Sequence, residues 1–189
     1  MSLIIDYGLD SPVRALLILA LSMKDKEQKK EMDVLHLQKV IRYFEHLQDQ
    51  KTIDFSDFKL GGVSYELREN LETLVECGLV NKVGSKYFLS EEGEKAEKEL
   101  LSKYAEEKIR KLRFAKLQLN DLTDNETLFL MYMLIPSTRK HSTKFEDLYK
   151  KRDVYVPRLF LKGRINSTTA AKWRGIDEKE FLESLSTRG

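Results

Sequence analysis

The 189-residue sequence predicts a mainly α-helical fold with a small β-hairpin. Two observations predict this class. Apolar residues recur at intervals of three and four over most of the chain, which is the spacing of one face of a helix. Residues 79–89 instead form two short strand-like runs on either side of Gly84-Ser85, a dipeptide that favours a two-residue hairpin turn. We therefore expect a set of packed helices that carries a single hairpin.

Two helices are expected before residue 50. The first begins at Pro12, whose missing N–H would have no partner in the first turn, and Asp10 or Ser11 is its expected cap. A charged linker over residues 24–31 leads to a second helix, which Asp33 is expected to cap. The buried positions of the two helices are expected to be Val13, Leu16, Leu17, Ala20, Leu21, Leu37, Val40, Ile41, Phe44 and Leu47.

A third helix is expected after Gly61-Gly62, which interrupt the pattern. Ser64 is its expected cap, and Gly78 is expected to end it in a left-handed conformation. The hairpin follows at once. Ser90 is then expected to cap a long helix over residues 91–116.

The order of these elements is helix, helix, capped helix, hairpin, helix. This is the order of a winged helix-turn-helix, in which the third helix is the recognition helix and the hairpin is the wing. The string Leu74-Val75-Glu76-Cys77-Gly78-Leu79-Val80, followed by Tyr87-Phe88-Leu89-Ser90-Glu91-Glu92-Gly93, resembles winged-helix regulators. The resemblance implies a winged-helix domain over residues 10–120 that includes the long helix.

A second resemblance lies in the same region. Leu37-Gln38-Lys39-Val40 with Ile41 and Tyr43-Phe44, and later Val63-Ser64 with Leu67, is similar to the Panacea-type antitoxin domain. That domain has Gly-Pro where this chain has Gly61-Gly62. Together the two resemblances cover residues 33–100 and imply an antitoxin-like, DNA-binding fold.

The third helix carries side chains suited to the edges of DNA bases. Tyr65, Arg68 and Asn70 are the candidate base contacts, since arginine pairs with guanine and asparagine with adenine. In the wing, Lys82 and Lys86 are candidates for contacts to the phosphate backbone. Three glutamates of the same helix would repel phosphates, so a protein-interaction face is the alternative. They are Glu66, Glu69 and Glu72.

A second, helical domain is expected over residues 121–189. Thr123-Asp124-Asn125-Glu126 is a capping box, and it opens an apolar helix that Pro136 ends. We expect this helix to pack on the long helix before it. Further along the chain, one or two helical turns are indicated by Phe145, Leu148 and Tyr149.

Residues 159–185 have the spacing of a helix-turn-helix. Ser167, or Asn166 before it, is expected to cap a helix in which the small Ala171 leaves room for a crossing helix. Gly175 supplies a turn with positive φ, and Asp177 caps the next helix. The residues of that helix expected to face inward are Phe181, Leu182 and Leu185.

This segment resembles a family of small helix-turn-helix antitoxins. The matching residues are Gly163, Arg164, Ile165, Ala170, Ala171, Gly175, Ile176, Phe181, Leu182 and Leu185. Either Asn166 takes the place of the family's serine, or this chain has one extra residue before the cap. Members of that family continue into a tail that clamps a toxin. This chain stops at Gly189, so a toxin partner is not expected.

The basic residues of the chain concentrate in one block. The whole chain has a net charge of +2, whereas residues 1–135 have −4, residues 136–174 have +8 and residues 175–189 have −2. Such a block attracts a polyanion before the rest of the surface does. Its candidate DNA contacts are Arg164, Asn166, Ser167, Lys172 and Arg174. The acidic last helix opposes this interpretation, so a packing or dimer module is the alternative.

Several classes of function find no support in the sequence. Cys77 is the single cysteine, which excludes an internal disulfide and a cysteine-rich zinc module, and we expect it to be buried. His36 and His46 lie ten residues apart, not at the spacing of a zinc pair, and are expected on the surface or half-buried. Phosphate-loop, dinucleotide and nucleophile-elbow motifs are missing. We therefore expect no enzyme, no cofactor and no metal.

The expected function is that of an antitoxin-like transcriptional regulator, which binds duplex DNA through the winged helix and the basic C-terminal helix-turn-helix. The helix over residues 91–116 is the candidate surface for a homodimer. A protein–protein adaptor without DNA binding is the alternative. The expected location is the cytoplasm, because a lone cysteine suits a reducing compartment and the apolar run 15–23 is too short to span a bilayer.

Overall fold

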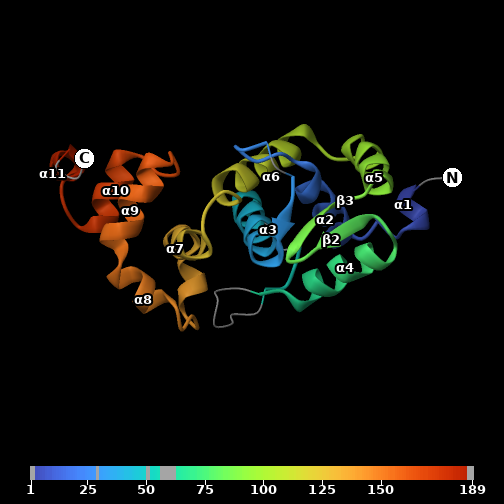
Figure 1. Ribbon diagram of the computed structural model, residues 1–189, viewed down its shortest axis with the longest axis horizontal. Helices are drawn as coiled ribbons and strands as arrows, with labels where there is room; N and C mark the ends of the chain where they lie inside the picture. The colour runs from blue at the N-terminus through green and yellow to red at the C-terminus, as the bar shows by residue number, and fades with distance from the viewer. Residues whose placement is uncertain (1–2, 29, 50–51, 56–62, 187–189) are drawn as a thin grey trace.

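The computed structural model describes residues 3–28, 30–49, 52–55 and 63–186, and it is mainly helical with one small antiparallel sheet. The chain forms an elongated molecule, with the N-terminal elements and the sheet at one end and the last four helices at the other (Figure 1). Helix α7 lies between the N-terminal elements and the last four helices (Figure 1). The expected mainly α-helical class with a hairpin is confirmed. Gly61-Gly62 lie outside the described residues.

The N-terminal group runs from residue 3 to residue 119. Its helices and strands are α1 (Leu3–Asp6), α2 (Pro12–Ser22), β1 (Met32–Asp33), α3 (Val34–Gln48), α4 (Tyr65–Glu76), β2 (Val80–Val83), β3 (Lys86–Leu89), α5 (Glu91–Leu101) and α6 (Glu106–Leu119). The C-terminal group consists of α7 (Asp124–Leu134), the short 3₁₀ helix η1 (Pro136–Arg139), α8 (Phe145–Lys150), α9 (Arg152–Leu161), α10 (Ser167–Arg174) and α11 (Glu178–Ser186).

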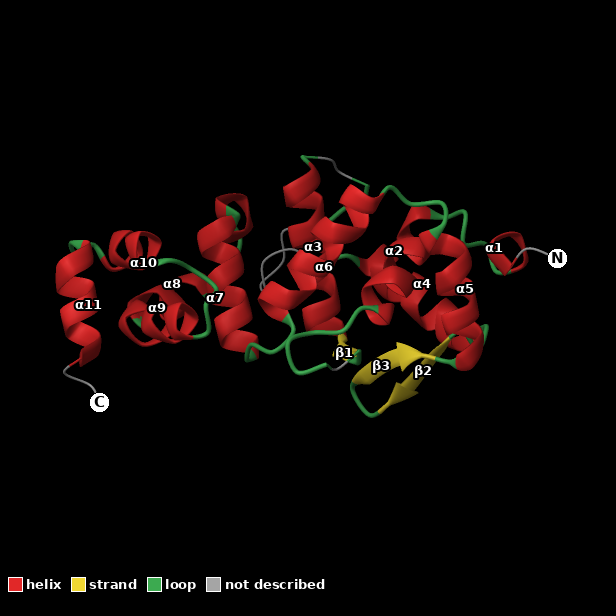
Figure 2. Cartoon of the chain, turned by 90° about the horizontal axis from the view of Figure 1, so that it is seen from above, coloured by secondary structure: helices red, strands yellow, loops and turns green. Residues whose placement is uncertain are grey.

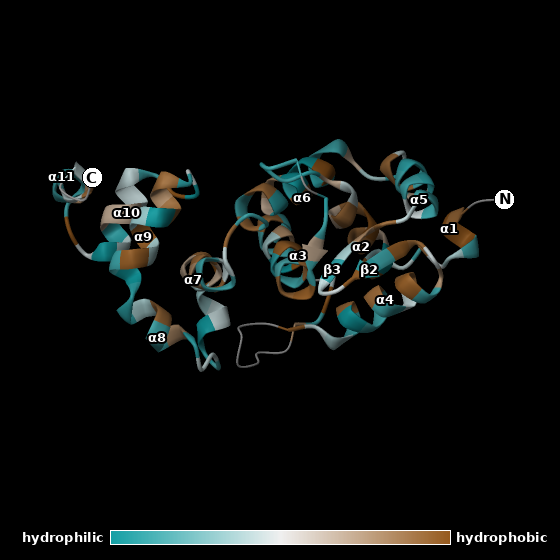
Figure 3. Cartoon of the chain, in the orientation of Figure 1, coloured by the Kyte–Doolittle hydropathy of each residue, from teal (hydrophilic) through white to brown (hydrophobic). Residues whose placement is uncertain are grey.

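Helix α2 is the centre of the N-terminal core. Almost every side chain from Val13 to Ser22 is buried, because α3, α4, α5, α6 and strand β3 all pack against it. Its apolar residues therefore lie on all sides of the helix, not on one stripe. Figure 3 shows the contrast between this apolar central helix and the hydrophilic outer helices such as α5.

The sheet has the strand order β1-β3-β2, and both pairs are antiparallel. The hairpin was predicted correctly: Val83 pairs with Lys86, and Gly84 in the turn has a φ of 59°. Strand β1 was not predicted, because Met32 and Asp33 are too few to show an alternating pattern. In Figure 2 the sheet lies to one side of the helices and the hairpin projects beyond them.

Most residues that were expected to cap a helix do so in the structure. Asp33, Ser64 and Ser90 each accept a hydrogen bond from a backbone N–H of the first turn that follows. Thr123 and Glu126 form the expected reciprocal capping box at the start of α7. Ser11 makes no such side-chain bond, although Pro12 does occupy the first helical position.

The expected long helix over residues 91–116 was wrong. Helix α5 ends at Leu101 and α6 begins at Glu106. The buried residues explain the break: Leu100 and Leu112 are twelve positions apart, which places them about 120° apart around one straight helix. Two separate helices can turn both residues towards the core. The reason for expecting a dimer through one long helix is therefore removed.

Three smaller expectations were also wrong. Helix α7 packs mainly against α3, α8 and α9, and not on the helix that precedes it. Leu182 is 43% exposed, although Phe181 beside it is completely buried. Cys77 is exposed at the C-terminal cap of α4. Among the described residues, none of the helices has the length and apolar character needed to cross a membrane.

Candidate nucleic-acid interface

Helix α4 presents a polar outer face beside the hairpin. Its inner face buries Leu67, Leu71 and Leu74, so the helix periodicity turns Tyr65 and Arg68 outward. The Tyr65 side chain is 56% exposed. The two side chains therefore lie on the outer, exposed face of α4.

Asn70, the third candidate base contact, already has internal partners. Its side-chain oxygen accepts a hydrogen bond from Nε of Arg14 at 2.8 Å, and its amide nitrogen donates to the Glu66 carbonyl at 2.9 Å. Arg14 belongs to α2, so this bond ties α4 to the central helix. The structure thus gives Asn70 a packing role, and a base contact would have to replace these two bonds.

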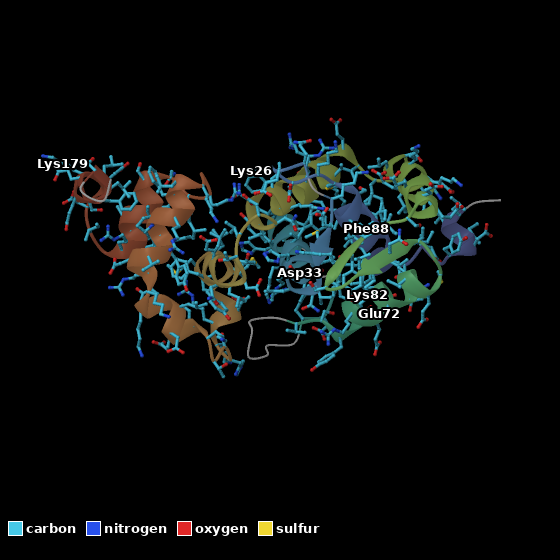
Figure 4. The ribbon with its side chains drawn as sticks, viewed as in Figure 1. Lys26, Asp33, Glu72, Lys82, Phe88 and Lys179 are labelled. Carbon is cyan, nitrogen blue, oxygen red and sulfur yellow. The ribbon has the colours of Figure 1, made fainter. Side chains whose placement is uncertain are left out.

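The two hairpin lysines proposed as phosphate contacts are both held by carboxylates. Nζ of Lys82 lies 2.9 Å from Oε1 of Glu72, and the Tyr87 hydroxyl donates to the same oxygen at 2.8 Å. The hydrogen bond from Lys82, followed by the one from Tyr87, lowers the pKa of Glu72 below its ordinary value. Figure 4 shows Lys82 and Glu72 close together beside the hairpin. Lys86 lies 3.1 Å from Oδ2 of Asp33.

Arg164 is inside the C-terminal group and not on its surface. Its side chain is completely buried and its guanidinium forms an ion pair with both carboxylate oxygens of Asp121. It also donates to the Lys162 carbonyl at 3.1 Å. The expected contact of Arg164 with DNA is corrected here, because a buried and paired guanidinium does not reach a phosphate. The antitoxin-like pattern includes Arg164 but does not indicate its ion-pair partner, which lies 43 residues earlier.

The start of α10 is occupied by side chains of its own domain. Asn166 is the cap, since its side-chain oxygen accepts from the backbone N–H of Thr169 at 2.8 Å. Glu178 of α11 accepts hydrogen bonds from the hydroxyl groups of both Ser167 and Thr168. This carboxylate covers the helix start that was expected to meet a phosphate.

Arg174 and Lys172 differ in their surroundings. Nε of Arg174 lies 2.9 Å from Oδ1 of Asp153, and the same guanidinium donates to the Ser184 hydroxyl at 2.8 Å. Lys172 is exposed, and no ion pair joins it to another described residue. Of the five candidate DNA contacts between residues 164 and 174, Lys172 is thus the exposed cation without an ion pair to a described residue.

Five more exposed cations of the basic block have no ion pair with a described residue, and they lie earlier in the chain than Lys172. They are Lys140, Lys144, Lys150, Lys151 and Arg158. The basic residues can be counted from the sequence, but only the fold decides which of them meet an internal carboxylate.

His36 connects the N-terminal elements to α7, and its burial corrects the expected surface or half-buried position. Nδ1 lies 2.9 Å from Oδ2 of Asp33. Nε2 lies 2.8 Å from the Leu122 carbonyl oxygen and 3.1 Å from Oγ1 of Thr127. Each nitrogen faces an acceptor, so the geometry favours a ring that is protonated on both.

The same histidine is part of the one group of possible metal ligands found among the described residues. Single ligand atoms of Asp33, His36 and Asp124 lie within 4.8 Å of one another. A metal ion needs a ring nitrogen with a free lone pair, whereas both nitrogens of His36 donate hydrogen bonds to other groups. The arrangement is therefore that of a buried hydrogen-bonded cation.

Comparison of the chain with protein-family models, with curated proteins and with solved structures finds no match. The function is therefore inferred from the arrangement of elements and side chains.

Proposed function

We propose that the protein is a DNA-binding transcriptional regulator whose residues 10–120 form a winged helix-turn-helix. One observation carries the proposal: the chain order α2, β1, α3, α4, β2, β3, with a sheet of order β1-β3-β2. In a winged helix-turn-helix the helix in the position of α4 enters the major groove, and the hairpin in the position of β2 and β3 contacts the neighbouring backbone.

The exposed side chains of α4 fit this role. Arg68 carries a planar guanidinium that can donate two hydrogen bonds to one guanine. Tyr65 is the first residue of α4, about one turn before Arg68. Lys82 and Lys86 exchange their carboxylate partners for phosphates at small cost, because ion pairs on the surface contribute only about 0–1 kcal/mol.

The test is selection of binding sites from a pool of randomised duplex DNA, followed by affinity measurements on the enriched site. We expect one motif to be enriched. Arg68→Ala should then weaken binding by about 1–3 kcal/mol and relax the preference at one base pair. Arg110→Ala is the matched control, since Arg110 is an exposed arginine of α6 far from the proposed reading helix. A pool without enrichment, together with no binding to mixed duplex DNA at low salt, would overturn the proposal.

A second candidate function is a protein–protein adaptor that has this fold and does not bind DNA. The charges favour it at two places. The outer face of α4 exposes Glu66 and Glu69, and Asp121 and Asp153 neutralise two arginines of the C-terminal group. Failure of the DNA experiment would support this candidate.

A further inference from the structure

We infer that a second surface, separate from α4 and the hairpin, holds the phosphate backbone of duplex DNA. This α8 surface consists of Arg139, Lys140, Lys144, Phe145, Tyr149, Lys150, Lys151 and Arg152. It rests on the proposed function in one respect, namely that the partner is duplex DNA. It differs from the sequence-based prediction, which placed the basic contacts on Arg164, Lys172 and Arg174.

The centre of the α8 surface is a stack of two arginines and two aromatic rings. Cζ of Arg139 lies 5.1 Å from the ring centroid of Phe145, and Cζ of Arg152 lies 5.0 Å from that of Tyr149. The two rings are neighbours on α8, with centroids 5.5 Å apart. Each of the two neighbouring rings therefore has one guanidinium group over it.

The stack is anchored to the rest of the C-terminal group. Tyr132 of α7 meets Phe145 edge to face at 5.7 Å, and Arg139 donates from Nε to the Tyr132 carbonyl. All four members of the stack are half-buried. A guanidinium held over an aromatic face loses less conformational freedom when it binds an anion, because its orientation is already fixed.

Arg152 keeps its donors available. No hydrogen bond or ion pair joins its guanidinium to another residue in the described part of the chain. A planar guanidinium suits phosphate better than an ammonium group does, because its parallel N–H groups match two phosphate oxygens. The stack thus presents at least one ready donor pair for a phosphate.

Four exposed lysines, Lys140, Lys144, Lys150 and Lys151, are each the chain neighbour of one member of the stack. Residues 139–152 contain six Lys and Arg and two acidic residues, Glu146 and Asp147, a net charge of +4. Neither acidic residue forms an ion pair with the four lysines. Each such lysine can neutralise a phosphate and release a counterion, which gives affinity that does not depend on base sequence.

A stretch of equal length elsewhere in the chain has no such surplus and provides a control. Residues 97–110, which cover the end of α5 and the start of α6, contain four Lys and Arg and four acidic residues. The four basic residues there, Lys98, Lys103, Lys108 and Arg110, are exposed as well. This near-neutral stretch serves as a control with the same number of removable cations.

The partner that fits the α8 surface is a phosphate backbone and not an unpaired base. A base would stack on an open aromatic face, whereas Arg139 and Arg152 already cover Phe145 and Tyr149. The expected contribution is therefore to position the protein on the duplex while α4 contacts the bases.

The experiment measures binding of the full chain to a fluorescent mixed-sequence duplex over a range of salt concentrations. The test variant carries Lys140→Gln, Lys144→Gln, Lys150→Gln and Lys151→Gln. Its salt slope should fall by about 2 to 4, since each phosphate contact contributes about 0.9, and binding at low salt should weaken about tenfold or more. The control variant carries Lys98→Gln, Lys103→Gln, Lys108→Gln and Arg110→Gln and should keep the wild-type slope.

Arg152→Lys tests the stack separately, because it keeps the charge and removes the planar fork; binding should weaken about two- to fivefold. Circular dichroism checks that each variant folds. If the wild type binds and the salt slope of the test variant falls no further than that of the control variant, the inference is overturned and the proposed function stands. A wild type that does not bind the duplex even at low salt overturns both. Loss of slope in the test variant alone supports the inference.

Discussion

Nε2 of His36 donates to the carbonyl oxygen of Leu122 across 2.8 Å, and the two residues are 86 positions apart in the chain. His36 lies in the first turn of α3, whereas Leu122 lies in the connection between α6 and α7. On its other side the ring bonds to Asp33, which also pairs with Lys86 of β3. One buried imidazolium therefore connects the sheet, α3 and the start of the C-terminal group.

This arrangement predicts that His36 stabilises the protein only while it is protonated. Burial disfavours the charged ring, but the hydrogen bond and charge of Asp33, with the Leu122 carbonyl and Asp124, raise the pKa of His36 above its ordinary value of 6.5. The stabilisation is complete below that value and is lost as the pH rises through the folded-state pKa. In urea unfolding, the wild type should have a higher free energy of unfolding than His36→Gln at pH 6. This difference should disappear as the pH rises to the alkaline side of neutrality. A constant difference between the two proteins would contradict the prediction.

The pH dependence of two buried lysines has the opposite sign. Nζ of Lys116 is buried and donates to the carbonyl oxygens of Ala20 at 3.0 Å and Lys30 at 2.6 Å. Burial lowers the pKa of Lys116 to about 7, and that of Lys39 to about 7. The unfolded chain then binds more protons than the folded one between pH 7 and 10, so stability rises over that window.

Lys116→Met should flatten this rise, because methionine fills the space and has no proton to lose. The wild type should gain up to a few kcal/mol from pH 7 to 10, at about 1.4 kcal/mol per pKa unit, and the variant should gain clearly less. Lys108→Met, at an exposed position of α6, is the control and should follow the wild type. The measurement is the free energy of unfolding in urea at each pH, and equal rises in all three proteins would refute the idea.

The pair Arg164 and Asp121 should matter for stability and not for DNA affinity. Removal of one partner leaves a buried charge without compensation, so Arg164→Met should destabilise the chain by about 3–5 kcal/mol. The double variant Arg164→Met with Asp121→Leu should recover part of this loss, since both charges are then absent. Thermal unfolding measures the effect, and Lys172→Gln is the exposed control. A stable Arg164→Met protein whose DNA binding has a reduced salt slope would support the sequence-based prediction that Arg164 contacts DNA.

The sequence predicted local structure well where a single side chain determines it. Asp33, Ser64, Ser90 and the capping box at Thr123 act within three residues of their own position, so their pattern is visible without the fold. Gly175 likewise has the expected positive φ of 74°. These features indicated the order of helices and the position of the hairpin.

Long-range pairing is what the sequence did not show. Asp121 neutralises Arg164, Glu178 covers the start of α10, and α5 and α6 separate because two buried stripes face different directions. Each of these depends on residues that are distant in the chain or on the direction of the core. The number of basic residues was therefore correct evidence for a charged block, but it did not identify which of them remain available to a phosphate.

Gly93 holds α5 against the hairpin and cannot carry a side chain. A Cβ atom at this position would lie 2.1 Å from the backbone carbonyl oxygen of Leu79, and a backbone oxygen cannot move aside as the end of a side chain can. Gly93→Ala should therefore push α5 away from the strands and destabilise the protein by about 1–3 kcal/mol, despite alanine's better helix propensity. Lys98→Ala in the same helix, at an exposed position, should change stability by less than about 0.5 kcal/mol. Urea unfolding of the two variants gives the comparison, and a Gly93→Ala protein as stable as the wild type would show that α5 does not need this close approach.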